Sequence, residues 1–181
     1  MTVIEQLAAL RGLMKQQGIA AYIVPGNDPH ASEYMAPHWM EMSWLTGFLG
    51  ETGTAVVTMK QALLWTDSRY YLQAEAELAG STIGLMRESD VDCPSITTWL
   101  SKNLKAGEVV AVNPEMYSVN DYARLRDSLK ESDIALQSAD LIAPLWTEDR
   151  PPIPMECTGN CTVHLERRNH YVSSELYHAQ R

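Results

Sequence analysis

The chain has 181 residues, a formal net charge of −9 and a sequence pI near 4.9. Hydrophobic residues make up 45% of it, with five Trp and eight Tyr, which suffices for the core of one folded domain and excludes wholesale disorder. Lysine and arginine are scattered rather than clustered, which argues against a surface for nucleic acid or an anionic membrane. No apolar run of about 18 residues exists, so we expect no membrane-spanning segment.

The N-terminus and the cysteines indicate the compartment. Residues 1–6 lack the basic region and the apolar stretch of a secretory signal. The three cysteines, Cys93, Cys157 and Cys161, are odd in number and have no framework spacing, as expected in a reducing environment. We therefore expect a soluble acidic protein of the cytoplasm.

The first 29 residues predict a helix that returns directly into a strand. Thr2 and Glu5 have the spacing of a capping box, and apolar residues then recur at helical intervals until Gly18. The apolar run 20–24 follows and ends in the turn 25–29, which contains two prolines. This order is typical of α/β folds.

A polar group follows that strand, at the edge where open α/β sheets commonly bind ligands. Asp28, His30, Ser32 and Glu33 could suggest a hydrolytic cluster. All four lie within six residues, however, whereas a nucleophile, its base and the orienting group usually come from separate elements. We interpret the segment as a polar loop with an Asx turn and a helix cap at Ser32.

Three glycines, Gly47, Gly50 and Gly53, close the apolar segment 39–45 and suggest a phosphate-binding loop. No Gly-Lys-Ser/Thr is present, and the strand follows the glycines instead of preceding them. We therefore expect glycine here because the backbone turns tightly.

The stretch 50–71 is the centre of the predicted sheet. Two short apolar runs, 55–58 and 62–65, are separated by three residues and predict a β-hairpin. The polar turn 66–69 then leads into a helical pattern, with Asp67 and Arg69 at its entrance. We expect the chain before this stretch to build one flank of the sheet and the chain after it to build the other.

The rest of the pattern alternates strands with helices. The predicted elements are a strand at 82–86, a helix opened by Pro94 and ending before Gly107, a strand at 109–112, a helix capped by Ser118 with Asp121 three residues on, an edge strand at 134–136 and a short helix from Asp140 to Trp146. Six strands and about five helices, with one hairpin among crossovers, predict an α/β fold with a mixed six-stranded sheet flanked by helices.

Four blocks in this order carry a family resemblance: residues 28–34 (DPHASEY), 45–48 (LTGF), 53–58 (GTAVVT) and 64–74 (LWTDSRYYLQA). They resemble the N-terminal domain of cytosolic-type Xaa-Pro aminopeptidases (aminopeptidase P, peptidase family M24) in the creatinase/prolidase superfamily. Residues 150–154 (RPPIP) resemble the junction with the next domain. The resemblance covers roughly residues 3–155. It implies a creatinase/prolidase N-terminal fold, with its ribonuclease H-like motif, for a domain spanning 1–155.

The resemblance implies a non-catalytic domain that shapes substrate access and subunit contacts for a metallopeptidase. In the superfamily, a separate C-terminal domain cuts the bond before proline with two metal ions, usually Mn²⁺, held by two Asp, one His and two Glu. Only 27 residues follow Pro154. We therefore expect this chain to have no catalytic residue, metal ligand or cofactor of its own and to hydrolyse nothing alone. Short Xaa-Pro peptides would be substrates of the full-length parent, which could be a homodimer.

The resemblance assigns substrate binding to Arg69, His30 and Asp67. In the similar aminopeptidases, the arginine of a Thr-Asp-Gly-Arg-Tyr motif reaches toward bound peptide. Here Ser68 replaces the glycine, which would alter the turn because serine does not readily adopt positive φ. An arginine suits a peptide carbonyl or carboxylate because it donates in parallel pairs and stays charged.

Each assignment has a structural alternative. Asp67 could instead cap the following helix and pair with Arg69 as a local surface arrangement. His30, with Glu33, could equally position its loop against the catalytic domain. A stand-alone peptide- or protein-binding module of the same fold is an alternative for the chain as a whole.

Residues 156–181 differ in character, holding two of the three Cys and three of the five His. We predict an atypical, disordered tail. The rival interpretation is a small zinc site made by Cys157, Cys161, His164 and His170, whose thiolate and imidazole ligands suit zinc. The segment has few apolar residues to pack around a metal, which favours the disordered tail.

Overall fold

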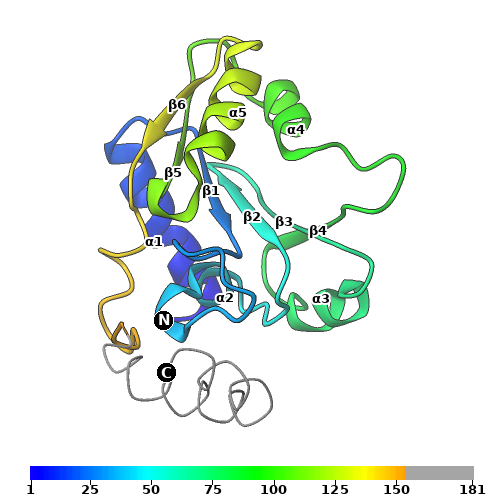
Figure 1. Cartoon of the computed structure of the whole chain (residues 1–181), viewed down its shortest axis with the longest axis vertical. Helices are drawn as coiled ribbons and strands as arrows, with labels where there is room; N and C mark the ends of the chain where they lie inside the picture. The colour runs from blue at the N-terminus through cyan, green and yellow to red at the C-terminus, as the bar shows by residue number, and fades with distance from the viewer. Residues whose placement is uncertain (154–181) are drawn as a thin grey trace, which may run out of the picture. The chain divides into compact units, whose positions relative to one another are not determined.

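The computed structural model describes residues 1–153, and Met1–Arg150 form one body (Figure 1). The disordered tail predicted for 156–181 and the proposed zinc ligands Cys157, Cys161, His164 and His170 lie outside the described residues. No helix among residues 1–153 is long and apolar enough to cross a bilayer.

A mixed six-stranded sheet runs through this body, as predicted. Strand β2 (Thr54–Thr58) is antiparallel to both of its neighbours, whereas the other neighbouring pairs are parallel, so β2 runs against the remaining five strands. In spatial order the strands are β4 (Ile83–Arg87), β3 (Ala62–Thr66), β2 (Thr54–Thr58), β1 (Ala21–Pro25), β5 (Val109–Val112) and β6 (Ala135–Ser138).

The β2–β3 hairpin lies in the middle of the sheet, but the flanks are not divided as predicted. The chain after the hairpin supplies β4 beside β3 and also β5 and β6 beyond β1. Strand β1 pairs with β2 along one edge, so its other edge needs a partner for its backbone groups, and the parallel strand β5 provides it. The expectation that each half of the chain builds one flank is therefore wrong.

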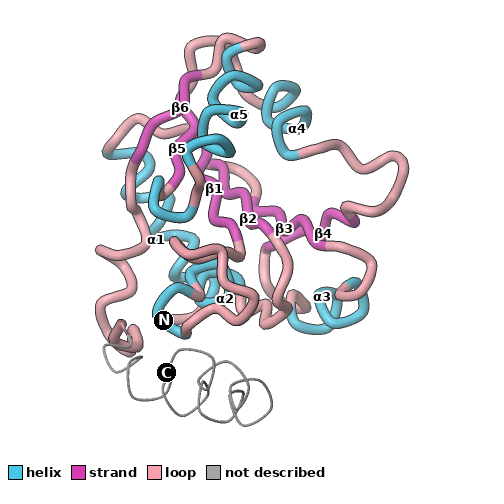
Figure 2. The backbone as a smooth tube through the Cα atoms, in the orientation of Figure 1, coloured by secondary structure: helices cyan, strands magenta, loops and turns pink. Residues whose placement is uncertain are grey.

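Helices cover both faces of the sheet (Figure 2). Tyr22 and Val24 of β1 pack into one core cluster with residues from the helices before and just after the hairpin, whereas Ile23 packs into a second cluster with Leu100 and Leu129. Successive strand residues point to opposite faces, so one short strand can serve both clusters. The first face carries α1 (Val3–Gln16), α2 (Glu41–Thr46) and α3 (Tyr71–Glu77), and the second carries α4 (Ile96–Asn103) and α5 (Val119–Lys130).

Two of the predicted helix starts are confirmed in atomic detail. The Glu5 N–H donates to the Thr2 hydroxyl at 3.3 Å, and the Thr2 N–H donates to the Glu5 carboxylate at 2.7 Å, which completes the capping box of α1. The Ser118 hydroxyl accepts the Asp121 N–H at 3.1 Å and caps α5. Polar side chains thus satisfy backbone donors that a helix start otherwise leaves free.

The helix predicted from Asp140 to Trp146 is wrong, because this segment forms turns. Asp140 does accept the N–H groups of Ile142 and Ala143, at 3.0 and 2.9 Å, as a helix cap would. Pro144 follows at once; it has no N–H and disfavours a helical residue before it. The sequence pattern missed α2 instead, which ends at Gly47 in the left-handed region with φ of 75°.

Gly50 is required by packing. A Cβ added there would lie 2.1 Å from the ring of Phe48, which is fully buried. The glycines at 47, 50 and 53 thus serve backbone geometry and close packing, and the rejection of a phosphate-binding loop agrees with this geometry.

We predict that Gly50→Ala lowers the free energy of unfolding by about 1–3 kcal/mol, because the Phe48 ring must move. The matched control is Gly12→Ala in α1, where the added Cβ meets no atom within 4 Å. That control should raise stability by about 0.5–1 kcal/mol, since alanine favours a helix over glycine. Urea denaturation of both variants tests the pair, and equal stabilities would contradict the packing argument.

Candidate functional site

The candidate site lies at the edge of the sheet where β1 and β3 both end. Residues 49–53, which lead into β2, pass between the loop after β1 and the turn after β3. The Gly26 N–H donates to the Gly53 carbonyl at 2.8 Å, and the Thr66 hydroxyl donates to the Thr52 carbonyl at 2.6 Å. One segment is therefore attached to both neighbouring loops.

Arg69 is held by Asp67 through both carboxylate oxygens. Its Nε donates to Asp67 Oδ1 at 2.9 Å and its Nη2 to Asp67 Oδ2 at 2.7 Å. Nη2 also donates to the Thr52 hydroxyl at 3.2 Å. These side-chain hydrogen bonds hold the pKa of Asp67 below its usual range and raise the pKa of Arg69, so both groups stay charged.

The opposite edge of the same guanidinium is available. Nη1 has no hydrogen-bond partner among residues 1–153, and the side chain is 66% exposed. The guanidinium carbon lies 5.2 Å from the centre of the Tyr70 ring, which limits the freedom of the side chain further. Arg69 can therefore offer the two N–H groups of Nη1 to acceptors such as a peptide carbonyl or a carboxylate oxygen, while Asp67 fixes its orientation.

The structure tests two predictions about the turn 66–69: that Asp67 caps the following helix and pairs with Arg69, and that Ser68 alters the turn. Asp67 does not cap α3, because the residue before the helix is Tyr70 and no side chain caps it. Asp67 instead accepts the Arg69 backbone N–H at 2.9 Å, so the predicted pairing is confirmed and the predicted cap is wrong. Ser68 is not among the described residues with positive φ, so the turn does not need the glycine of the family motif.

The loop after β1 is organised by Asp28. One carboxylate oxygen, Oδ1, accepts the His30 N–H at 2.9 Å and the Ser32 N–H at 3.0 Å, which confirms the Asx turn. Burial raises the pKa of Asp28, but the hydrogen bonds from Ser32 and His30 outweigh it and lower the pKa. The helix cap expected at Ser32 is wrong, because the next helical residue is Pro37, in a short 3₁₀ turn (Pro37–Trp39).

His30 is exposed, and its backbone rather than its imidazole is the part held in place. No hydrogen bond or ion pair within residues 1–153 joins it to Arg69 or Asp67. A cleft of about 160 Å³ separates its loop from the segment 49–51, with Glu33, Tyr34 and Glu51 among its lining residues. The structure therefore unites Asp67 with Arg69 and places the His30 loop on the other side of segment 49–52.

Sequence reasoning missed Thr52, Glu51 and Tyr70 at this site. The Tyr70 hydroxyl donates to Glu51 Oε2 at 3.3 Å, so all three residues surround Arg69. The position of Thr52 could have been predicted from the hairpin register. In the hairpin Thr54 pairs with Trp65, and extending that register by two residues places Thr52 opposite Asp67.

Comparison with known proteins gives the family. Residues 6–144 match the family model of the creatinase/prolidase N-terminal domain. The chain belongs to the creatinase/prolidase N-terminal domain family. The resemblance to the N-terminal domain of Xaa-Pro aminopeptidases is thereby confirmed.

The relatives of this creatinase/prolidase domain are much longer than the chain. It is 44% identical over 137 residues to the Xaa-Pro aminopeptidase ApepP of Drosophila melanogaster, and 39% identical over 150 residues to human Xaa-Pro aminopeptidase 2. These matches cover 75% and 82% of this chain but only 22% of each relative. The chain thus spans about a fifth of the length of these relatives.

Solved structures agree. The X-prolyl aminopeptidase of Caenorhabditis elegans, a cytosolic enzyme with a di-nuclear active site, matches with a TM-score of 0.78 at 30% identity. The match covers 93% of this chain and 32% of that one. The N-terminal domain of the cytoplasmic peptidase PepQ from Mycobacterium tuberculosis has a TM-score of 0.55 at 19% identity, which supports the fold alone. The predicted fold class is confirmed.

The creatinase/prolidase domain does not provide a metal site in its described part. Within residues 1–153, no group of three or more His, Cys, Asp or Glu side chains could hold a metal ion. The residues of this part therefore offer no ligand set for a two-metal centre.

A buried ion pair closes the creatinase/prolidase domain. Arg150 Nη2 donates to Glu41 Oε1 at 2.9 Å, and these side chains are only 12% and 2% exposed. Arg150 Nε also donates to the His38 carbonyl at 3.2 Å, and its guanidinium lies over the Trp146 ring. Sequence reasoning missed this pair, which joins residues 109 positions apart.

Glu41 remains difficult to ionise despite its partner. Burial is the main reason that its pKa rises to about 7, and the negative charge of Asp140 adds to the effect. Arg150 acts in the opposite direction without cancelling it. Nearby, Asn113 Nδ2 is buried and makes no hydrogen bond of good geometry among the described residues, although it lies close enough to Glu41 to lower the pKa of that carboxyl slightly.

We predict that the free energy of unfolding falls as pH rises from about 4.5 to about 7 through Glu41. Its pKa is higher in the folded state, so its contribution to stability is complete below the ordinary pKa and is lost as pH rises through the folded value. The loss is at most about 3 kcal/mol. Glu41→Gln should flatten this part of the pH profile measured by urea denaturation.

The control is Glu148→Gln, which removes one carboxylate from an exposed position in the same body. It reports the effect of net charge alone. Parallel profiles for the wild type and Glu41→Gln would show that Glu41 does not carry the pH dependence.

Proposed function

We propose that this chain serves as the non-catalytic N-terminal domain of a cytoplasmic Xaa-Pro aminopeptidase, in which Arg69 binds the peptide and the edge of the sheet restricts access. The observation that carries the proposal is the half-used guanidinium of Arg69 in a domain of this family. Asp67 and Thr52 use three of the five N–H groups of Arg69, and the two on Nη1 remain on a side chain that is mostly exposed. A peptide carbonyl or a carboxylate is an acceptor that suits these N–H groups.

Exposed apolar side chains lie at the same end of the sheet, as expected for a surface that another domain covers. Tyr34 and Leu49 line the cleft and are 80% and 66% exposed. Leu72, in the first turn of α3 close to Arg69 in the chain, is 83% exposed. Large apolar side chains gathered around a polar site favour contact with a further protein surface. In this proposal the catalytic domain covers them and His30 positions its loop there.

Hydrolysis belongs to the catalytic domain in this proposal. The two Mn²⁺ ions, their ligands and the activated water would all come from outside residues 1–153, which hold no suitable ligand group. Short Xaa-Pro peptides are the proposed substrates, because the relatives are Xaa-Pro aminopeptidases. A homodimer is the proposed assembly of the full-length parent.

We predict that the purified 181-residue chain releases no amino acid from a short X-Pro peptide, with or without added Mn²⁺. The measurement is the appearance of free N-terminal amino acid, with an intact Xaa-Pro aminopeptidase as the positive control. Mn²⁺-dependent release that co-purifies with the chain would overturn the non-catalytic role.

The role of Arg69 is testable in a chimera. Residues 1–150 replace the matching part of the Caenorhabditis elegans X-prolyl aminopeptidase, of which this chain covers 32%. We predict that Arg69→Ala lowers kcat/KM for an X-Pro peptide about 10- to 100-fold, the loss expected for a hydrogen bond from a charged group. Arg69→Lys should recover only part of the activity, because lysine keeps the charge but loses the fork.

The control for the chimera is Arg126→Ala, which removes another exposed arginine that pairs with a neighbouring aspartate, on α5. It should leave kcat/KM unchanged. Equal values for Arg69→Ala and Arg126→Ala would remove Arg69 from substrate binding. A folded chimera without activity would argue instead that this domain cannot serve such an enzyme.

A further inference from the structure

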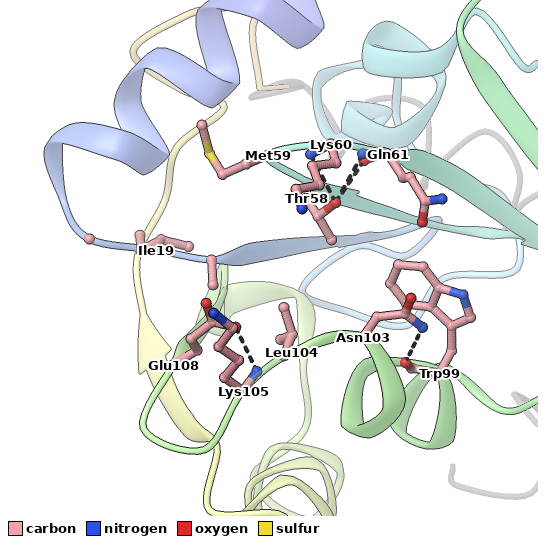
Figure 3. A pocket seen from close by; sticks show the side chains of 12 residues that line it. Ile19, Thr58, Met59, Lys60, Gln61, Trp99, Asn103, Leu104, Lys105 and Glu108 are labelled. Atoms are coloured by element: carbon pink, nitrogen blue, oxygen red, sulfur yellow. Dashed lines mark hydrogen bonds between the residues drawn. The ribbon is translucent and has the colours of Figure 1, made fainter.

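A second cavity, of about 630 Å³, lies at the other edge of the sheet, where β1 begins (Figure 3). Three segments line it: residues 18–20 before β1, the β2–β3 turn at 58–61, and residues between 99 and 108. The Arg69 site lies beyond the opposite ends of these strands. The volume is within the range of small-molecule sites, about 300–1,000 Å³.

The walls of this cavity are mixed, with apolar and polar side chains in similar measure. Ile19 and Leu104 line it with Met59 of the turn and Trp99 of α4. In Figure 3, Trp99 and Asn103 form one side and Ile19 the other. Trp99 packs edge-on against the buried Trp65, with ring centres 5.8 Å apart, so its position is fixed by the core.

Two neutral polar side chains of the lining, Asn103 and Thr58, make hydrogen bonds within the protein. Asn103 Nδ2 donates to the Trp99 carbonyl at 2.8 Å. The Thr58 hydroxyl accepts the N–H groups of Lys60 and Gln61 at 3.3 and 3.0 Å. Glu108, the carboxylate of the lining, accepts the Lys105 N–H at 2.7 Å and closes its own loop.

The ammonium groups of Lys60 and Lys105, in contrast to the polar groups above, have no ion-pair partner in the described part of the chain, although the whole chain carries a net charge of −9. Lys60 lies in the β2–β3 turn, away from any helix end, and Lys105 follows Leu104, the C-cap residue of α4. The three other lysines of the sequence, Lys15, Lys102 and Lys130, lie in last turns of helices, where a cation complements the helix dipole.

We propose that this cavity is a second binding site, for a small aromatic carboxylate. The aromatic ring would lie against Trp99 and Leu104, where apolar contact and ring packing favour it. The carboxylate would lie between Lys60 and Lys105 at the rim. Lys102 offsets the partial negative charge at the end of α4, which leaves these two lysines for the ligand. This site goes beyond the proposed peptidase function and does not depend on it.

The test titrates the full chain with phenylacetate and follows the Trp99 indole N–H and the backbone amides of residues 18–20 and 58–61 by NMR. Saturable shifts confined to these groups are expected. Phenylacetamide, which has the same ring without the charge, should bind at least about fivefold more weakly. Absence of saturable shifts with phenylacetate, or equal binding of the amide, would overturn the proposal.

Variants locate the charge. Lys60→Gln and Lys105→Gln should each weaken phenylacetate binding about two- to fivefold, the effect of one exposed charge. Lys130→Gln removes the same charge from the end of α5, outside the cavity lining, and should leave binding unchanged. Equal affinity in all three variants would reject the assignment. Arg69→Ala should not alter this binding, so the two sites can be tested separately.

Discussion

The hydrogen-bond register of the β2–β3 hairpin is the constraint on which the candidate site depends. Because β2 alone runs against the other strands, its leading segment returns to the edge where β1 and β3 end. The Gly53 carbonyl then accepts the Gly26 N–H from the loop after β1, and the Thr52 carbonyl accepts the side-chain hydroxyl of Thr66 at the end of β3. Two loops that are 40 residues apart in the chain are therefore positioned by one strand, and neither has to contact the other.

The Asp67–Arg69 and Glu41–Arg150 pairs contribute differently to the domain, because they differ in sequence separation and in burial. Asp67 and Arg69 are two residues apart, and the arginine is exposed while the aspartate is half-buried, so the pair orients one side chain and adds little to stability. Glu41 and Arg150 are far apart in the chain and buried, so forming the pair removes two charges from water. The raised pKa of Glu41 shows that this desolvation is not fully compensated. The first arrangement suits recognition, and the second joins distant parts of the fold.

Local pattern was sufficient for most of the fold. Capping boxes, apolar periodicity and the short hairpin turn each act over a few residues, so the strands, α1 and the Asp67–Arg69 pair could all be predicted. The prediction failed where two local signals compete. Asp140 accepts backbone N–H groups as a helix cap does, but Pro144 prevents a helix from forming after it. Nothing local marks Glu41 as the partner of Arg150, because a carboxylate at the start of a short apolar helix has the same sequence pattern whether buried or exposed. The position of Thr52 beside Asp67 could have been predicted in part, because it follows from the register of the hairpin once the hairpin itself is predicted.

The buried pair also connects the end of the domain to the loop beside the cleft. Arg150 donates to the His38 carbonyl and to Glu41, and both residues belong to the segment that follows the Asp28 loop without a break. Tyr22 fixes the same returning chain earlier: its hydroxyl donates to the Ala139 carbonyl at 3.1 Å and accepts the Leu141 N–H at 3.2 Å. Trp44 of α2 stacks on Trp146 between these points, with ring centres 5.5 Å apart. Residues 139–150 are thus attached to β1 and α2. Loss of the Glu41–Arg150 contact would therefore free a segment of α2 that adjoins Met40, a residue of the cleft lining.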